Sequence, residues 1–246
     1  MNSYTSILLG FVQGMTEFLP VSSSGHLVIF QSLLRDFEQP GILFDVILHF
    51  ATSLSVIYFF RKKIMQMSIY EGFVILIATI PAAFVGIFFE SIFEGLFSNI
   101  RFVGVALLIT GFINILIDRI PKGKKDPNIR SGFIVGVAQS FAIIPGISRS
   151  GSTIFTGRMF GLSKESAARF SFLLSVPAVL GATVFQLLKH GVSGVDNVGI
   201  YILGFIAAFV SGVLSIKVVI NLLYSEKFKY FGIYCFAVGL FVLTFF

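Results

Sequence analysis

The sequence predicts an all-α polytopic membrane protein made of two inverted repeats, each with a re-entrant helix hairpin and three transmembrane helices. Three observations lead to this fold class: the composition, the length of the apolar segments and an internal duplication. Of the 246 residues, 56% are hydrophobic and only 12% are charged, and the mean hydropathy is +0.94. Soluble domains carry about 25% charged residues, so apolar runs at this charge density indicate a membrane protein.

Charge and cysteine content argue against two function classes. The formal net charge of +6 does not indicate nucleic-acid binding, because basic loops are expected at the cytoplasmic face of any membrane protein. The single cysteine, Cys235, lies in an apolar run, so neither a disulfide nor a thiolate cluster can form. We therefore expect the lipid bilayer, and no nucleic acid, as a partner.

The first apolar segment is too short to cross a membrane. Residues 4–19 contain Gln13 and Glu17 and end at Pro20. About 16 residues at about 1.5 Å each reach only roughly 24 Å, less than a hydrocarbon core of about 30 Å. A second short apolar arm follows at residues 27–34. Two short arms joined by a turn predict a re-entrant hairpin, whose non-helical backbone must be buried in protein or line a wet cavity. The alternative is one spanning helix kinked at the proline.

The rest of the chain repeats this order on either side of a polar loop at residues 118–130. Three spanning candidates follow the first hairpin, at residues 42–60, 72–89 and 102–117. After the loop come the two arms of a second hairpin and three more spanning candidates, at residues 131–144, 153–162, 167–188, 198–223 and 229–246. We treat residues 1–246 as a single membrane domain, with one repeat at 1–120 and the other at 131–246.

An offset of 126 residues aligns the two hairpins. The aligned identical pairs are Gly10 with Gly136, Gln13 with Gln139, Ser22 with Ser148, Ser24 with Ser150 and Gly25 with Gly151. A duplication of this length is typical of membrane folds built from repeats. Each repeat has one hairpin and three crossings, and an odd number of crossings makes the repeats inverted. The hairpins then enter from opposite faces and meet near the midplane.

Basic residues in the loops predict the orientation. One face collects most of them: Arg61, Lys62, Lys63, Arg119, Lys122, Lys124, Lys125, Arg130, Arg158, Lys164, Lys227 and Lys229. The other face has Arg35, Arg101 and Lys189. By the positive-inside rule the first face is cytoplasmic, which places both termini outside a plasma membrane that the chain crosses several times.

The hairpins carry ionisable residues that a membrane core penalises. Glu17 lies one helical turn after Gln13, on the same face. A charge at membrane depth costs about 2.5–3.5 kcal/mol even on the most lenient scale. Glu17 therefore needs a partner, which we expect to be Arg149, His26 or a bound cation. The plainer interpretation is a structural ion pair between Glu17 and Arg149 that staples the two hairpins together.

The turn of each hairpin is rich in short polar side chains. The two runs are Ser22-Ser23-Ser24-Gly25 and Ser148-Arg149-Ser150-Gly151. Such turns direct backbone N–H groups and hydroxyls at one spot, which suits an anion, and an arginine adds a planar fork for phosphate oxygens. Helix N-capping explains one serine in each turn, but not three serines, a histidine and an arginine.

A pocket with hydroxyls, a carboxylate, a histidine and an arginine suits phosphoryl transfer. We expect Ser23 to be the nucleophile, His26 the base that takes its proton, and Arg149 the group that neutralises the phosphoryl oxygens. Glu17 would orient His26 or, with Gln13, hold a divalent cation.

Two further histidines are interpreted as structural. His49 lies in an apolar run and is interpreted as packed or interfacial, and His190 as a loop residue. The sequence contains no Walker loop, no Gly-x-Ser-x-Gly elbow and no paired metal-ligand histidines.

At these residues the sequence resembles the undecaprenyl-diphosphate phosphatase family, the bacitracin-resistance type of integral membrane phosphatase. One family motif has Glu or Gln four residues before a Glu, then Phe-Leu-Pro-Val-Ser-Ser-Thr/Ser-Gly-His; it corresponds to Gln13 to Glu17 and Phe18 to His26. The other, Pro-Gly-x-Ser-Arg-Ser-Gly-x-Thr, corresponds to Pro145 to Thr153. The resemblance covers the whole chain.

The resemblance implies that the chain hydrolyses a C55 polyprenyl diphosphate to the monophosphate and phosphate. This reaction recycles the lipid carrier for cell-wall synthesis and gives bacitracin resistance. It also implies Mg²⁺ or Ca²⁺ as cofactor, held by Glu17, although many members have Glu where this chain has Gln13. A polyprenyl diphosphate lipid is the implied partner, and a homodimer is left open. Catalysis is assigned to Ser23, His26, Glu17 and Arg149, and substrate binding to Ser22, Ser24, Gly25, Ser148, Ser150, Gly151, Thr153 and Gln13.

The alternative function is transport. Inverted repeats with broken helices are typical of secondary transporters, and a carrier or flippase of phosphate or polyprenyl phosphate would use the same serine turns and Arg149. A carrier needs to bind an anion but needs no base beside a nucleophile, so the pairing of Ser23 with His26 favours the enzyme.

Overall fold

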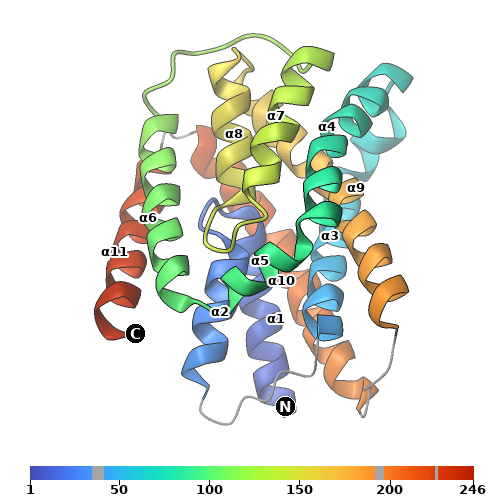
Figure 1. Ribbon diagram of the computed structural model, residues 1–246. Coiled ribbons are helices and arrows are strands. Elements are labelled where there is room, and N and C mark those ends of the chain that lie inside the picture. Colours follow the sequence, from blue (N-terminus) through green and yellow to red (C-terminus); the bar gives the residue numbers. More distant parts are fainter. Residues whose placement is uncertain (35–41, 192–196, 225–226) are drawn as a thin grey trace.

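The structure is a computed structural model that describes residues 1–34, 42–191, 197–224 and 227–246 (Figure 1). Within those ranges all the regular elements are helices. The helices are α1 Ser3–Phe18, α2 Ser23–Leu33, α3 Ile42–Met65, α4 Ile69–Phe88, α5 Glu90–Phe97, α6 Ile100–Ile117, α7 Ile129–Phe141, α8 Arg149–Met159, α9 Lys164–His190, α10 Val198–Tyr224 and α11 Phe228–Phe245.

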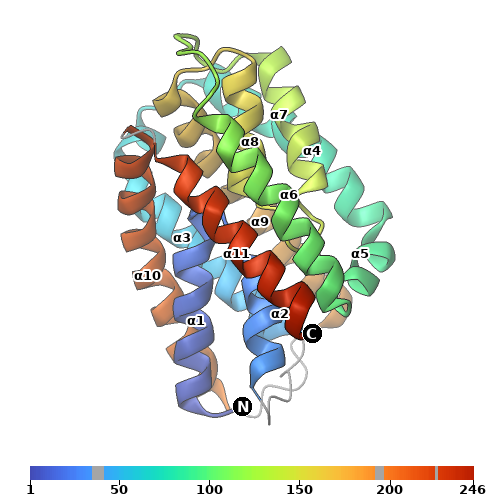
Figure 2. The same ribbon diagram turned by 90° about the vertical axis from the view of Figure 1, so that its left-hand side faces the viewer.

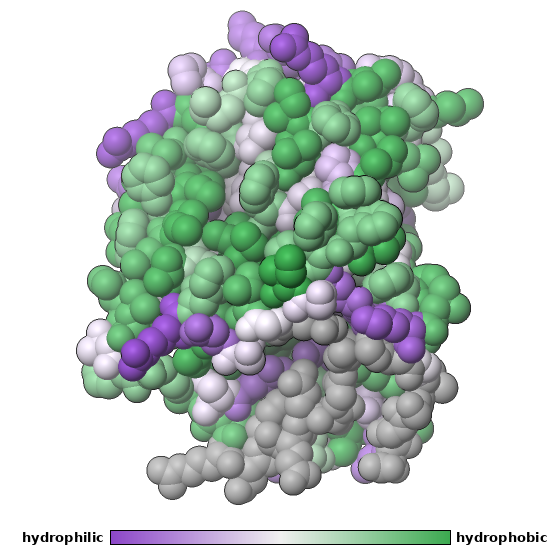
Figure 3. Space-filling model, viewed as in Figure 1, coloured by the Kyte–Doolittle hydropathy of each residue, from purple (hydrophilic) through white to green (hydrophobic). Residues whose placement is uncertain are grey.

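Among the described residues, six helices are long and apolar enough to cross a membrane: α3, α4, α6, α9, α10 and α11. The face seen in Figure 3 is hydrophobic over most of its height, and hydrophilic residues gather at the upper end and in a band further down. The prediction of an all-helical membrane protein with six spanning helices is therefore confirmed.

Two pairs of short helices occupy opposite ends of the bundle. α1 and α2 lie at the end that holds both chain termini, and α7 and α8 lie at the other end (Figures 1 and 2). The two connecting turns meet inside the molecule, where the Ser150 hydroxyl donates a hydrogen bond to the carbonyl oxygen of Leu19 at 3.1 Å. This meeting point brings together the two motifs of the sequence.

Glycines allow the short helices to approach their neighbours closely. α1 packs against α10, and α7 packs against α4. A Cβ atom on Gly10 would collide with the carbonyl oxygen of Gly204, and one on Gly136 would collide with that of Ala78. Close backbone approach of this kind is how membrane helices gain packing energy without a hydrophobic driving force between them.

Several helix boundaries differ from the prediction. α2 begins at Ser23 rather than residue 27, and α8 begins at Arg149 rather than residue 153. The reason is capping: the side chains of Ser22 and Ser148 accept hydrogen bonds from backbone N–H groups three residues later, so each helix starts inside its motif. Helix α5, which has eight residues, is not among the elements predicted from the sequence.

The central polar loop is tied to the bundle by a buried arginine. Arg158, expected among the exposed basic residues, is only 2% exposed. Its guanidinium donates to the carbonyl oxygens of Leu162, Ile120 and Pro121, each at 3.0 Å. Arg158 therefore holds loop backbone in place and is not one of the solvated loop charges. Arg35, also used to predict orientation, lies outside the described residues.

Candidate active site

Helix α6 holds the two turns against each other. The hydroxyl of Thr110 donates to the carbonyl oxygen of Gly146 at 2.8 Å and accepts from the backbone N–H of Ser148 at 3.0 Å. One helical turn later, the Asn114 amide donates to the carbonyl oxygen of Pro20. A single face of α6 thus satisfies backbone groups of both turns, which would otherwise be costly to bury.

The two turns have the same local construction. Ser22 caps α2 through the N–H of Gly25, and Ser148 caps α8 through the N–H of Gly151. In each turn the capping hydroxyl also lies near the hydroxyl of the serine two residues later, at 3.3 Å for Ser22 and Ser24 and 3.2 Å for Ser148 and Ser150. The N-cap interpretation of one serine in each turn is confirmed.

Two backbone positions explain the turn residues further. Ser22 has φ of 70°, a left-handed conformation that is uncommon for residues other than glycine, and Gly146 has φ of 93°. A Cβ atom on Gly25 would lie 3.1 Å from the Cα of Gly146. The turns therefore meet at glycines, and the strain at Ser22 is of the kind that clusters at functional sites.

Glu17 lies at the centre of the polar cluster formed where the turns meet. Its Oε1 atom is 2.6 Å from Arg149 Nη2, and its Oε2 atom accepts hydrogen bonds from the Ser23 hydroxyl at 2.7 Å and the Gln13 amide at 2.9 Å. The Glu17 side chain is only 6% exposed. The predicted pairing of Glu17 with Arg149 and its association with Gln13 are both present, so the buried carboxylate is fully satisfied.

Arg149 is also anchored from its other side. Its Nη1 atom donates to the carbonyl oxygen of Ser171 in α9 at 3.2 Å. The Ser171 hydroxyl lies 2.6 Å from that of Thr153, one turn after Arg149 in α8. Thr153 therefore supports the helix that presents Arg149 rather than reaching the Glu17 carboxylate itself.

The hydrogen bonds of the His26 ring go to groups other than Ser23, with which the prediction pairs it. Its Nδ1 atom lies 2.8 Å from the carbonyl oxygen of Ser22, and its Nε2 atom lies 2.8 Å from the hydroxyl of Tyr234 in α11. A carbonyl oxygen only accepts, so Nδ1 carries the hydrogen and, in the neutral ring, Nε2 accepts from Tyr234. Glu17 is not a hydrogen-bond partner of His26 either, because the two ring nitrogens lie against Ser22 and Tyr234. The Ser23 hydroxyl, at the start of α2, donates to Glu17 in α1, whereas the His26 ring lies against the carbonyl group of Ser22, the N-cap residue of α2.

His49 belongs to the Glu17 cluster, although it is not among the site residues predicted from the sequence. Its Nδ1 atom lies 2.9 Å from Gln13 Nε2 and 3.4 Å from Glu17 Oε2. From the sequence it is predicted to be a packed or interfacial histidine, the more frequent role of a single histidine in an apolar run. The usable signal was its position within a spanning segment, since an ionisable residue at membrane depth is by default a functional candidate.

Comparison with known proteins identifies the family. The family model described as Bacitracin resistance protein BacA matches residues 6–241. The chain belongs to this family. Curated relatives named undecaprenyl-diphosphatase include one from Christiangramia forsetii, which is 42% identical and aligns over 100% of this chain and 98% of its own length. The relative from Methanococcus vannielii is 40% identical over 97% of this chain and 98% of its own length.

The donor set of this BacA-family site does not fit a divalent cation held by the protein. Among the described residues, no three His, Cys, Asp or Glu side chains gather as a metal would require. Both oxygens of Glu17 are occupied, one by the Arg149 cation and the other by the hydrogens of Ser23 and Gln13. The Gln13 Oε1 atom is a buried acceptor without a partner, but one neutral carbonyl is a weak ligand for Mg²⁺ or Ca²⁺. The predicted metal role of Glu17 is therefore not supported by its surroundings.

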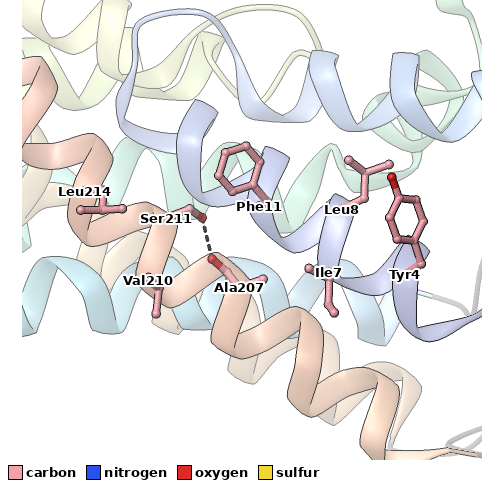
Figure 4. Close-up of a pocket in the computed structure, with 8 residues that line it drawn as sticks. All are labelled: Tyr4, Ile7, Leu8, Phe11, Ala207, Val210, Ser211 and Leu214. Atoms are coloured by element: carbon pink, nitrogen blue, oxygen red, sulfur yellow. Dashed lines mark hydrogen bonds between the residues drawn. The ribbon is translucent and has the colours of Figure 1, made fainter.

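A groove on the outside of the BacA-family fold is separate from this cluster. It runs between α1 and α10 and is lined by Tyr4, Phe11, Val210 and Leu214 among others (Figure 4). Ser211 also lines the groove, and its hydroxyl donates a hydrogen bond to the carbonyl oxygen of Ala207 at 2.6 Å. None of the predicted site residues lines it, and its apolar walls suit the surrounding lipid.

Proposed function

We propose that the chain is an undecaprenyl-diphosphate phosphatase that releases phosphate and leaves undecaprenyl phosphate in the membrane. The observation that carries this proposal is the contact of Ser23 with Glu17, itself paired with Arg149, inside a chain whose curated relatives bear that name. A nucleophile, an adjacent proton acceptor and a cation are the parts that phosphoryl transfer from a diphosphate requires.

The terminal phosphate would bind where α2 and α8 begin. The first N–H groups of a helix have no intrahelical partner, and the helix dipole favours an anion there. The hydroxyls of Ser24 and Ser150 flank these two starts, and Ser22, Gly25, Ser148 and Gly151 form their caps. Arg149 would exchange Glu17 for phosphate oxygens, which it can bind with two parallel hydrogen bonds.

The first chemical step would transfer the terminal phosphoryl group to Ser23. The bond between Ser23 Oγ and phosphorus forms, the bridging P–O bond breaks, and its electron pair stays on the departing polyprenyl monophosphate. The Ser23 proton passes to Glu17 Oε2, 2.7 Å away. Once Arg149 binds the phosphate, the Glu17 carboxylate no longer has the guanidinium as its partner. A carboxylate without that cation accepts the proton more readily.

The second step would hydrolyse the phosphoserine. A water attacks phosphorus, the bond to Ser23 Oγ breaks, and Glu17 returns its proton to the serine oxygen, while both hydrogens of the water leave on the inorganic phosphate. Arg149 stabilises the equatorial oxygens in both steps, a contribution that is worth several orders of magnitude in related chemistry. His26 would face the bound diphosphate from the same helix start, held in one tautomer by Ser22 and Tyr234.

The same proposal includes the finer topology. The pairs α1–α2 and α7–α8 would be re-entrant hairpins of two inverted repeats that enter from opposite faces. In its support, exchanging the repeats turns the contact of α1 with α10 into that of α7 with α4, and both contacts are present. The basic loops would face the cytoplasm, so the first hairpin and both termini would face outward, where the spent carrier is left.

The test is phosphate release from undecaprenyl diphosphate by the detergent-solubilised chain, in EDTA and in Mg²⁺. We expect release by the wild type, loss in Ser23→Ala, and retention in Lys122→Ala, whose side chain is exposed in the central loop. The two ionic conditions test the predicted cation directly. Absence of release from the wild type in both conditions would overturn the phosphatase proposal and favour the carrier.

A further inference from the structure

His49 has no part in the reaction steps above, yet it lies in the same cluster. It projects from α3, a spanning helix that contains neither motif, and its Nδ1 atom points to Gln13 and Glu17. About a third of its side chain is exposed, at 34%, whereas Glu17 is 6% exposed. His49 is thus considerably more exposed than the carboxylate that it faces.

The hydrogen bonds of Gln13 define which nitrogen of His49 carries its hydrogen. A carboxylate only accepts, so the Gln13 atom 2.9 Å from Glu17 Oε2 must be the amide nitrogen. The same nitrogen lies 2.9 Å from His49 Nδ1 and directs its second hydrogen there. Nδ1 is therefore an acceptor without a hydrogen of its own, and the ring hydrogen is on Nε2. This unprotonated basic nitrogen also lies 3.4 Å from Glu17 Oε2.

We propose that His49 accepts the Ser23 proton from Glu17 and so clears the carboxylate for the next step. This inference rests on the proposed phosphatase reaction. When Ser23 Oγ bonds to phosphorus, its proton moves to Glu17 Oε2 and then to His49 Nδ1, which gives an imidazolium with hydrogens on both nitrogens and restores the Glu17 anion. The partly exposed ring then releases a proton to water, so in the second step Glu17 passes a proton from the attacking water to the serine oxygen in place of the one it gave up, and the phosphate leaves with one hydrogen fewer. Before the transfer the Gln13 amide holds both acceptors in place, one hydrogen to each, and its second hydrogen leaves Nδ1 as the proton arrives.

The arrangement of charges favours this route. Glu17 Oε2 lies 3.4 Å from His49 Nδ1, and Asp45 lies one turn before His49 on α3. Both carboxylates favour an imidazolium at His49, and Arg149, which is paired with Glu17, opposes it less once it has turned to the phosphate. His26 is not placed to accept this proton, because its two nitrogens face the Ser22 carbonyl group and the Tyr234 hydroxyl, whereas His49 Nδ1 faces Glu17.

The experiment compares His49→Asn with His49→Ala in phosphate release by the full solubilised chain. An asparagine Oδ1 takes the place of Nδ1 and keeps the hydrogen bond from Gln13, but it cannot hold the proton. We expect kcat to fall by about 10²-fold in both variants with KM little changed, as for loss of a general base. Added imidazole should restore part of the turnover of His49→Ala, because the position is partly exposed. Tyr58→Phe on the same helix is the control, since Tyr58 is an exposed residue remote from the cluster.

The outcomes separate proton transfer from positioning. If His49→Asn turns over like the wild type, or if imidazole restores nothing to a folded His49→Ala, the ring only positions Gln13 and the proposal is wrong. Circular dichroism and thermal unfolding in detergent show whether each variant is folded. If the wild type itself releases no phosphate, the proposed function fails before the relay is tested, so the two failures are distinguishable.

Discussion

Arg149 and Glu17 are 132 residues apart and join the two motifs, with the guanidinium Nη2 2.6 Å from the carboxylate Oε1. Both side chains are largely buried, at 15% and 6% exposed. Burying two charges is costly, and a buried pair stabilises a protein little compared with an apolar pair of the same shape. The two hydrogen bonds that Ser23 and Gln13 add to the carboxylate make this ion pair part of a site rather than only a staple between helices.

A double substitution distinguishes these roles. Arg149→Met leaves Glu17 as an unpaired buried charge, and we expect it to lower the free energy of unfolding by about 3–5 kcal/mol. Glu17→Gln with Arg149→Met removes both charges and should recover most of that stability in thermal unfolding, but no phosphate release. Turnover in the double variant would mean that the pair is only structural.

The spanning helices and the meeting of the two motifs could be predicted from the sequence, because each has a recognisable local pattern of residues. Apolar length marks a spanning helix, and a charge at membrane depth requires a partner, which led from Glu17 to Arg149. The cluster around Glu17 was harder to predict. His49 reaches it from a helix without a motif, and Tyr234 reaches His26 from the last helix, so both contacts depend on packing that no spacing records. The pairing of Ser23 with His26 was predicted from their separation of three residues. That spacing does not show that the His26 ring binds the carbonyl oxygen of Ser22 instead.

Close backbone packing predicts which glycines the fold needs. A Cβ on Gly136 would collide with the carbonyl oxygen of Ala78 and force α7 away from α4. We expect Gly136→Ala to lower the free energy of unfolding by about 1–3 kcal/mol, the usual cost of overpacking. Gly181, within α9, has no atom within 4 Å of its added Cβ. Gly181→Ala should raise stability by about 0.5–1 kcal/mol through helix propensity. Equal thermal shifts in the two variants would contradict the packing argument.

The bond from Tyr234 to His26 predicts a specific effect of removing one hydroxyl. In Tyr234→Phe the ring can keep its stacked position, with its centroid 5.6 Å from that of His26, but Nε2 loses its donor and a buried acceptor is left unsatisfied. We expect turnover to fall several-fold if His26 must hold one orientation toward the bound diphosphate. Tyr230→Phe, one turn earlier on α11 and exposed, is the matched control. Identical kinetics in the two variants would mean that the orientation of His26 does not matter to the reaction.

Gln13 predicts how the site would respond to a second carboxylate. The Gln13 amide donates to Glu17 Oε2 and to His49 Nδ1, and a glutamate at this position would donate to neither. Two adjacent carboxylates repel each other in a buried site unless a proton or a cation lies between them. We therefore expect Gln13→Glu to release little phosphate in EDTA and to recover as Mg²⁺ is added, because paired carboxylates and substrate phosphates are the ligands that Mg²⁺ prefers.

The Mg²⁺ titration of Gln13→Glu is read against the wild type and Gln13→Ala. Gln13→Ala removes the amide without adding a charge, so it should lose turnover that Mg²⁺ does not restore. A Mg²⁺ response confined to Gln13→Glu would mean that the Gln13 amide replaces a metal ion in this chain, because its hydrogen bond holds Glu17 Oε2 in position. A Gln13→Glu variant that is equally active in EDTA and in Mg²⁺ would contradict this account, because the site would then work with two carboxylates and no metal ion between them.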